Sequence, residues 1–123
     1  METKPTVESS CLFCKIVQGE IPAARIRESE HTLIIADIVP QAPVHFLILP
    51  KRHAANLSEF MKGPNAAPEL DNLFSQALLL VEEKNLSRKG YRLVVNTGEE
   101  GGQTVPHLHV HLLAGRLMGW PPG

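Results

Sequence analysis

The segment at residues 107–113 constrains the fold most, because histidine and aliphatic residues alternate strictly from His107 to Leu112. A period of two is typical of a β-strand with one polar and one apolar face. Same-face side chains on a strand lie about 6.7 Å apart, so His107, His109 and His111 would line up around one small anionic group. On a helix only His107 and His111 would share a face. A core strand that merely happens to carry histidines is the competing interpretation.

The rest of the chain has the pattern of one globular domain. Hydrophobic residues make up 43% of the 123 residues and charged residues 20%, which is typical of such a domain. We expect a mobile tail at residues 1–10 and a single domain at residues 11–123. The domain should contain a short helix after residue 11, strands near residues 24–28, 31–37, 44–50 and 91–96, and an amphipathic helix from Pro68 to about Asn85.

Charge and hydropathy exclude several classes of protein. The net charge is −1 and the pI is near 6.6, and no Lys/Arg cluster is interleaved with aromatic residues, so a nucleic acid polymer is not an expected partner. No apolar run is long enough to span a membrane. Residues 1–5 lack the basic and apolar regions of a secretory signal, and we therefore expect a cytoplasmic location.

The only two cysteines, Cys11 and Cys14, form a C-x-x-C pair, which by itself is a weak signal. Three interpretations stay open: two of the four ligands of a structural zinc site, a redox pair, or two unliganded thiols in a turn. The zinc interpretation requires two more ligands from elsewhere in the chain, and six histidines are available.

Several polar residues stand at the ends of the expected strands. Asp37 is a candidate for binding the vicinal hydroxyls of a sugar, although an aspartate that caps a turn fits equally well. His45 is isolated in an apolar run, where a satisfied core histidine is commoner than a catalyst. Asn96 precedes a glycine-rich loop that reaches Thr104, and loop N–H groups together with these two side chains can hold phosphate oxygens.

Residues 107–113 resemble the His-φ-His-φ-His-φ-φ signature of the histidine triad (HIT) superfamily. The resemblance covers nearly the whole chain after residue 10 and extends to the nucleotide-binding Hint branch, in a variant with an N-terminal C-x-x-C. The other matching segments are Ile21-Pro22-Ala23, Asp37-Ile38, Pro40-Gln41-Ala42-Pro43 with His45-Phe46-Leu47, Gly90-Tyr91-Arg92 through Val94-Val95-Asn96, Gly101-Gly102-Gln103, and Gly115-Arg116 to Trp120-Pro121-Pro122-Gly123.

This resemblance implies an α+β, HIT-like fold: an antiparallel sheet of about five strands with one long and one short helix, joined to a second sheet across a homodimer. It also implies hydrolysis of purine nucleoside 5′-phosphoramidates, which releases a nucleoside monophosphate and an amine through a nucleotidyl-histidine intermediate. A neutral imidazole, with an ordinary pKa of ~6.5, is a competent nucleophile at neutral pH and later a good leaving group. No metal is required for that route.

Carried over residue by residue, the resemblance makes His109 the nucleophile and assigns catalytic roles to His111, Thr104 and His45. Zinc-carrying relatives are matched at Cys11, Cys14, His53 and His107, where Zn²⁺ would brace the fold. Trp120 would lie near the active site of the second subunit. The implied nucleotide contacts are Phe13, Ile16, Ile21, Ile35, Asp37, Ile38, Asn96, Gly102, Gln103, Thr104, His109 and His111.

Three residues depart from the family pattern. Ile35 and Pro106 stand where an aromatic residue is common, and Thr104 stands where many relatives have serine. These departures bear on how the base stacks and how the leaving group is held.

Two other functions stay open. Histidines that alternate along a strand can hold a catalytic zinc ion that activates water, which would make the protein a zinc-dependent hydrolase. The chain could also be a nucleotide-binding interaction module in which catalysis is incidental, and then His109→Ala would leave its partner function intact.

Overall fold

The computed structural model describes residues 7–123, so the first six residues of the predicted tail lie outside the described residues. Residues 7–10 are exposed and lead into the first helix. The elements in chain order are α1 Leu12–Val17, β1 Arg25–Glu28, β2 Thr32–Ala36, β3 Val44–Pro50, α2 Leu57–Phe60, α3 Ala66–Glu83, the 3₁₀ helix η1 Leu86–Arg88, β4 Tyr91–Val95 and β5 Val110–Ala114.

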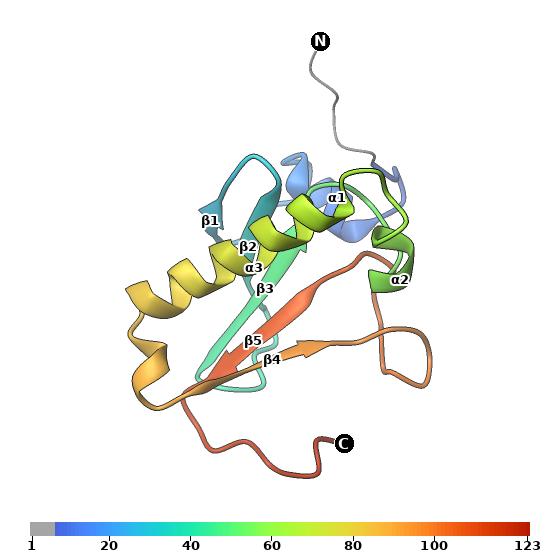
Figure 1. Ribbon diagram of the computed structural model, residues 1–123. Coiled ribbons are helices and arrows are strands. Elements are labelled where there is room, and N and C mark those ends of the chain that lie inside the picture. The colour runs from blue at the N-terminus through green and yellow to red at the C-terminus, as the bar shows by residue number, and fades with distance from the viewer. Residues whose placement is uncertain (1–6) are drawn as a thin grey trace.

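The five strands form one antiparallel sheet in the order β1-β2-β3-β5-β4 (Figure 1). The last strand in the chain therefore lies between β3 and β4, where His111 is paired with Leu47 on one side and Val94 on the other. The predicted α+β fold, with a five-stranded antiparallel sheet and one long helix, is confirmed.

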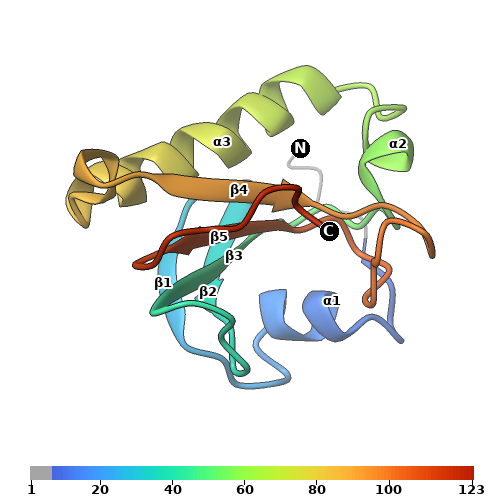
Figure 2. The same cartoon turned by 90° about the horizontal axis from the view of Figure 1, so that it is seen from below.

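Helix α3 covers one face of the sheet, and α1 lies on the opposite side (Figure 2). Ile48 and Leu112 point from the sheet into a core that includes Leu73 and Leu80 of α3, and all four side chains are fully buried. Burying an aliphatic side chain of this size stabilises the fold by about 1.5–3 kcal/mol. Within residues 7–123, no helix has both the length and the apolar character needed to cross a membrane.

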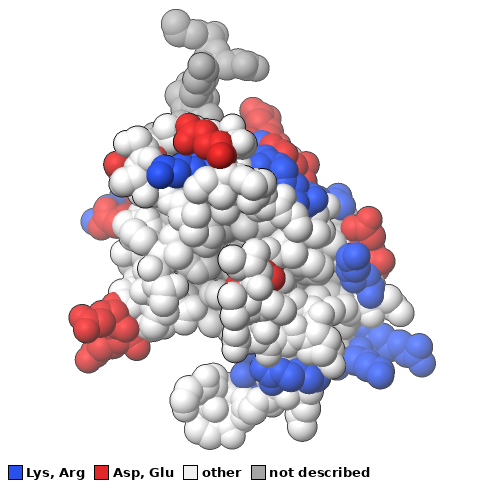
Figure 3. Space-filling view, turned by 180° about the vertical axis from the view of Figure 1, so that it is seen from behind, with Lys and Arg blue, Asp and Glu red and all other residues white. Residues whose placement is uncertain are grey.

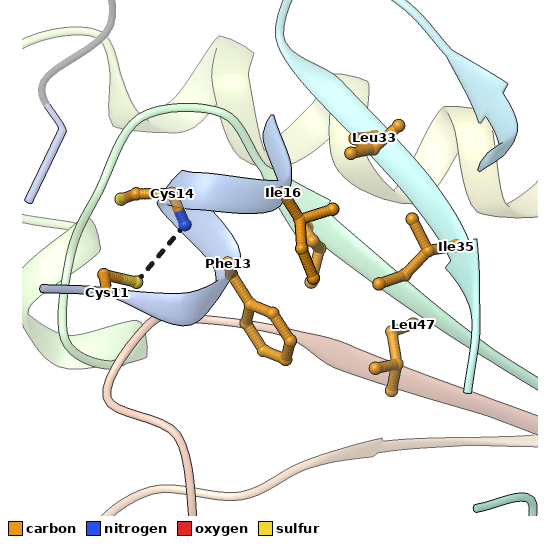
Figure 4. Packing of buried hydrophobic residues seen from close by; sticks show 8 residues of the cluster. Cys11, Phe13, Cys14, Ile16, Leu33, Ile35 and Leu47 are labelled. Carbon is orange, nitrogen blue, oxygen red and sulfur yellow. Dashed lines mark hydrogen bonds between the residues drawn. The ribbon is translucent and has the colours of Figure 1, made fainter. Parts of the chain in front are cut away.

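A second apolar cluster fills the space between α1 and the other face of the sheet. Phe13 and Ile16 of α1 pack with Ile35 of β2 and Leu47 of β3 (Figure 4). Because alternate residues of a strand point to opposite faces, the register also places His45 and His111 on this α1 side of the sheet, next to Leu47 and Leu113.

The histidine strand begins later than the sequence pattern predicts. β5 starts at Val110, so the prediction that His107 and His109 belong to a regular strand is wrong. The His107 N–H donates to the Val105 carbonyl, and the Leu108 N–H donates to the Ala54 carbonyl, each at 2.9 Å. These amides therefore bind loop atoms and no neighbouring strand. The direction of the His107 ring is consequently not set by the alternation of side chains along β5.

Helix α2 was not predicted. Its N-terminus is capped by Asn56, whose side-chain oxygen accepts a hydrogen bond from the Glu59 N–H at 2.9 Å. An Asn followed three residues later by Glu is a recognised helix-start signal, although a helix of four residues leaves no periodic pattern to support it.

Candidate active site and metal centre

His109 lies immediately before β5, with its ring buried and held by the chain. Its Nδ1 is 2.8 Å from the main-chain oxygen of His107, and because a carbonyl oxygen can only accept, Nδ1 carries the proton of the neutral ring. The lone pair is therefore on Nε2. The rings of Phe13 and His111 each lie 5.0 Å from the His109 ring, both edge-on.

His45 and His111 form a directional chain of hydrogen bonds. The Gln41 N–H donates to His45 Nδ1 at 3.0 Å, so the proton of neutral His45 is on Nε2 and is donated to His111 Nδ1 at 2.9 Å. His111 in turn carries its proton on Nε2. The His111 ring beside His109 is therefore a hydrogen-bond donor.

Burial keeps both of these rings neutral at pH 7. Desolvation lowers the pKa of His111 to about 4, and repulsion from His109 and His45 acts in the same direction. Desolvation also lowers the pKa of His45, although the nearby Asp37 carboxylate opposes the shift. The tautomers set by the Gln41 N–H thus persist across the neutral range.

The Asp37 carboxylate follows β2 and has two contacts. Its Oδ1 accepts a hydrogen bond from the Val39 N–H at 2.8 Å, which is the turn-capping role that the sequence allowed. Its Oδ2 is 3.4 Å from His45 Nε2. Turn capping leaves this second oxygen at the site, so capping and ligand binding are compatible.

The glycine-rich loop before the histidines is held by side-chain amides. Gln103 accepts from the Gly98 N–H at 3.0 Å and donates to the carbonyls of Ala55 at 2.6 Å and Val105 at 2.9 Å. Asn96 donates to the carbonyl of Gly101 at 2.7 Å. Both N–H groups of the Gln103 amide are thereby used inside the protein, so this residue shapes the loop.

The expected base-binding residues differ widely in burial. Phe13, Ile16 and Ile35 are buried in the apolar cluster under α1, and Ile21 packs against that cluster. Ile38 is 91% exposed on the loop after β2. Thr104 and Gly102 are also exposed, on the loop that precedes the histidines.

A second constellation brings Cys11, Cys14, His53 and His107 together, with their ligand atoms all within 4.8 Å of one another. The His107 Nδ1 is 3.3 Å from the Cys11 Sγ, 3.5 Å from the Cys14 Sγ and 3.2 Å from the His53 Nδ1. In a tetrahedral zinc site with metal–ligand distances of about 2.0–2.3 Å, ligand atoms are roughly 3.3–3.8 Å apart. The four residues therefore fit a tetrahedral site in which two cysteines and two histidines bind one metal ion.

Hydrogen bonding and access both favour metal binding by this group. The His107 Nε2 donates to the Pro50 carbonyl at 2.8 Å, so its Nδ1 lone pair faces the thiols, as a metal ligand requires. Burial raises the pKa of the Cys14 thiol to about 11, and a nearby cation is the ordinary way to ionise such a thiol. A surface cavity of about 360 Å³, lined in part by Cys11, His53 and Thr104, provides a route for entry.

Charged side chains lie mainly at the rim of the face turned away from α3. Figure 3 shows this face with a mostly uncharged middle that contains one small acidic area, Lys and Arg along its lower edge, and an acidic group at one lower corner. Lys89, Arg92 and Arg116 line a groove beside the C-terminal segment. The His111 ring, 5.0 Å from the His109 ring and protonated on Nε2, is a hydrogen-bond donor near His109.

Sequence reasoning missed the main-chain atoms that set the tautomers. The N–H of Gln41 orients His45, the carbonyl of Pro50 orients His107, and the carbonyl of His107 orients His109. Main-chain atoms have no residue-type signature, so no pattern could identify them. The edge-on contacts of Phe13 with two histidine rings were likewise invisible in the sequence.

Comparison with known proteins gives consistent matches over most of the chain. The HIT domain model matches residues 18–118. A HIT family hydrolase from Legionella pneumophila is 49% identical, with 92% of this chain and 99% of that chain covered and a TM-score of 0.86. An uncharacterized HIT-like protein of Synechococcus elongatus is 47% identical over an alignment of 116 residues, with 91% of this chain and 96% of that protein covered. A histidine triad nucleotide-binding protein from Candida albicans is 33% identical, over 90% of this chain and 82% of that one, with a TM-score of 0.77.

Proposed function

This chain belongs to the HIT domain family, and we propose that it is a Hint-type hydrolase that cleaves purine nucleoside 5′-phosphoramidates into a nucleoside monophosphate and an amine. The hydrolase from Legionella pneumophila and the nucleotide-binding protein from Candida albicans support the two halves of this proposal, hydrolysis and nucleotide binding. The choice of a phosphoramidate rests on the resemblance to the Hint branch, and the arrangement of the histidines supports attack on phosphorus.

The observation that carries the proposal is the pairing of two imidazoles in complementary tautomers. His109 has its lone pair on Nε2 because Nδ1 donates to a carbonyl, whereas His111 has its proton on Nε2 because Nδ1 accepts from His45. The two ring centres are 5.0 Å apart. A nucleophile beside a hydrogen-bond donor suits attack on phosphorus, where charge on the phosphoryl oxygens needs stabilisation.

The reaction has two steps. In the first, the His109 Nε2 bonds to phosphorus while the P–N bond breaks, and the departing amine takes up a solvent proton relayed through the Thr104 hydroxyl. In the second, water attacks phosphorus, gives up a proton to solvent and displaces His109, which returns to its neutral form. The His111 Nε2–H donates to the phosphoryl oxygens in both steps, and His45 holds it in that tautomer.

The nucleotide would lie across the α1 side of the sheet. Phe13, Ile16 and Ile35 would contact the base with Ile21 and Ile38 at its edges. The Oδ2 of Asp37, which does not cap the turn, would accept from the ribose hydroxyls. In place of an aromatic residue, Ile35 gives an aliphatic surface for stacking. The phosphate contacts would come from Asn96, Gly102, Thr104 and His111, with Gln103 acting through the shape of the loop.

The Cys₂His₂ group would hold a structural Zn²⁺ ion. With four protein ligands a zinc site is closed and braces the fold, here by joining α1 to the loop after β3 and to the segment before β5. The reaction above needs no chemistry from this ion.

We also propose a homodimer formed through β4. This strand is at the edge of the sheet, and Tyr91 and Val95 on it are partly exposed. Antiparallel pairing of two β4 edges would bring the basic start of one strand, at Lys89, near the acidic loop of the other, at residues 99–100. Trp120, which is 83% exposed in the monomer, would then be buried near the active site of the second subunit.

A catalytic zinc ion held by the histidine strand is disfavoured by the tautomers. The ligand atoms of Asp37, His45 and His111 all lie within 4.8 Å of one another. The lone pair of His111 Nδ1, however, already accepts the Nε2–H of His45. His45 is in the same position because its Nδ1 accepts from the Gln41 N–H. A metal ion there would require the loss of a second imidazole proton.

The test is hydrolysis of adenosine 5′-phosphoramidate by the wild type, by His109→Ala and by His31→Ala as a control. His31 is exposed beside Glu30, so its loss should leave turnover unchanged. His109→Ala should lower kcat by about 10³-fold or more, and rapid acid quenching of the wild type should trap an acid-labile adduct on His109.

Two results would redirect the proposal. Full turnover by His109→Ala with no adduct would favour a metal-dependent hydrolase. Tight AMP binding without turnover in the wild type would favour the nucleotide-binding interaction module.

A further inference from the structure

His107 belongs to both constellations. Its ring Nδ1 faces the thiols of Cys11 and Cys14 and the Nδ1 of His53, whereas its main-chain oxygen accepts the Nδ1–H of His109 at 2.8 Å. One residue thus links the metal group to the nucleophile. No other contact fixes the His109 tautomer among the hydrogen bonds of residues 7–123.

The main chain around His107 depends on what its side chain binds. The segment lies outside β5, so no sheet partner holds its carbonyl, and its N–H is engaged only with the Val105 carbonyl two residues away. Its ring is fully buried and held on one side by the Pro50 carbonyl. The peptide unit that carries its carbonyl is held through the Leu108 N–H, which donates to the carbonyl of Ala54, the residue after His53, at 2.9 Å. On the side of Nδ1, the ring is held by the group of ligand atoms.

Phe13 provides a second link between the same two sites. It lies between Cys11 and Cys14 in α1, and its ring packs edge-on against both His107, at 5.8 Å, and His109, at 5.0 Å. Figure 4 shows the Phe13 ring leaving α1 on a different side from the two cysteines. A change in the turn that carries the cysteines would therefore also move the surface against which His109 packs.

We propose that occupancy of the Cys₂His₂ group sets the catalytic rate by holding His107, and through it the Nδ1–H bond of His109. His107 is a positioning residue in this scheme, and Cys11, Cys14 and His53 act through it. The proposed sugar and phosphate contacts come from other elements, at Asp37, Asn96, Gly102 and Thr104, so metal loss should lower kcat much more than it weakens affinity. This inference rests on the proposed function for its kinetic readout alone.

The experiment compares zinc-loaded and chelated wild type with His53→Asn, and with His31→Asn as a matched control outside the site. His53 comes from the loop after β3, and its ring lies next to that of His107, with ring centres 5.1 Å apart. Its replacement removes one ligand of the metal site and keeps the His107 side chain itself. The readouts are kcat and KM for adenosine 5′-phosphoramidate, AMP affinity by calorimetry, and the ¹H–¹⁵N signal of the His109 Nδ1–H.

Chelation, or His53→Asn, should lower kcat about 10–100-fold, the usual effect of losing an outer-shell partner. AMP affinity should change less than threefold, about as much as in the His31→Asn control. The His109 Nδ1–H signal should broaden or disappear through exchange with water. Added Zn²⁺ should restore both kcat and the signal in the wild type and in His31→Asn, but not in His53→Asn.

A folded metal-free wild type with unchanged kcat and an intact Nδ1–H signal would overturn the proposal. If the metal-free protein unfolds, Phe13→Leu decides, because it keeps all four ligands and removes the edge contact with His109. Zinc-bound Phe13→Leu should show a lower kcat and faster exchange at Nδ1, and wild-type values for both would refute the coupling. If zinc-loaded wild type has no turnover, the proposed function fails, whereas the response of the Nδ1–H signal to Zn²⁺ still tests the coupling.

Discussion

Replacing His45 by phenylalanine should disable His111 as a donor while leaving the nucleophile in place. His45 is 6% exposed and donates from Nε2 to His111 Nδ1 at 2.9 Å. Phenylalanine is similar in shape but has no polar atom. The His111 Nδ1 then loses its only donor within residues 7–123 and takes up the ring proton itself, so that its Nε2 no longer donates to a phosphoryl oxygen.

The size of the effect follows from the loss of one positioned donor through an outer-shell contact. Such losses lower activity about 10–100-fold, which corresponds to about 1.4–2.8 kcal/mol of transition-state free energy. Stability should fall by about 1–3 kcal/mol if the His111 nitrogen is left unpaired, although the Gln41 N–H, on an exposed loop, can bind water instead.

His45→Gln is the matched control, because its amide oxygen can accept from the Gln41 N–H while its amide nitrogen donates to His111. We expect His45→Phe to lose kcat with adenosine 5′-phosphoramidate, and His45→Gln to recover most of it. The reasoning is refuted if His45→Phe keeps wild-type kcat, or if His45→Gln is as impaired as His45→Phe while both variants remain folded at the assay temperature.

Three further predictions concern stability and the loop. Leu112→Ala removes a fully buried side chain between the sheet and α3, so the free energy of unfolding in urea should fall by about 2–5 kcal/mol; a loss under 1 kcal/mol would contradict the packing. Because the folded state lowers the pKa of His111 to about 4, the stability that the neutral ring contributes is complete above pH 6.5 and is lost as the pH falls towards 4; His111→Asn should flatten this slope in melting curves, and an unchanged slope would show that another group causes it. A methyl group at Gly101 would collide with the Thr97 carbonyl, so Gly101→Ala should distort the loop and raise KM while the melting temperature stays nearly unchanged. An unchanged KM would show that the loop does not take part in phosphate binding.

Most of the fold was predictable because its elements are local in the sequence. The alternating and continuous apolar runs marked β1 to β4, and the stripe that includes Leu73 and Leu80 marked α3. The start of β5 was not predictable, because period-two spacing at His107 is preserved even where the main chain binds loops in place of a strand. A hydrophobic pattern describes the spacing of residues along the chain, whereas strand pairing depends on which other segment lies next to the strand in space.

The site was predictable in its residue types and less so in their arrangement. The C-x-x-C pair and the histidines pointed to a metal group, and the structure brings Cys11, Cys14, His53 and His107 together. The sequence could not show that Asp37 caps its turn with only one carboxylate oxygen, because this depends on where the main-chain N–H of Val39 lies. The tautomers also depend on main-chain atoms from distant segments.

The position of β5 in the middle of the sheet ties folding and chemistry to one register. Its neighbouring residues serve opposite purposes, with Leu112 sealing the core under α3 and His111 facing the other side. A shift of the register by a single residue would place an imidazole in the apolar core and a leucine at the position of the hydrogen-bond donor. A chain that has folded with this core has therefore also oriented His111 towards the site. Natural selection for a well-packed core consequently preserves the site as well.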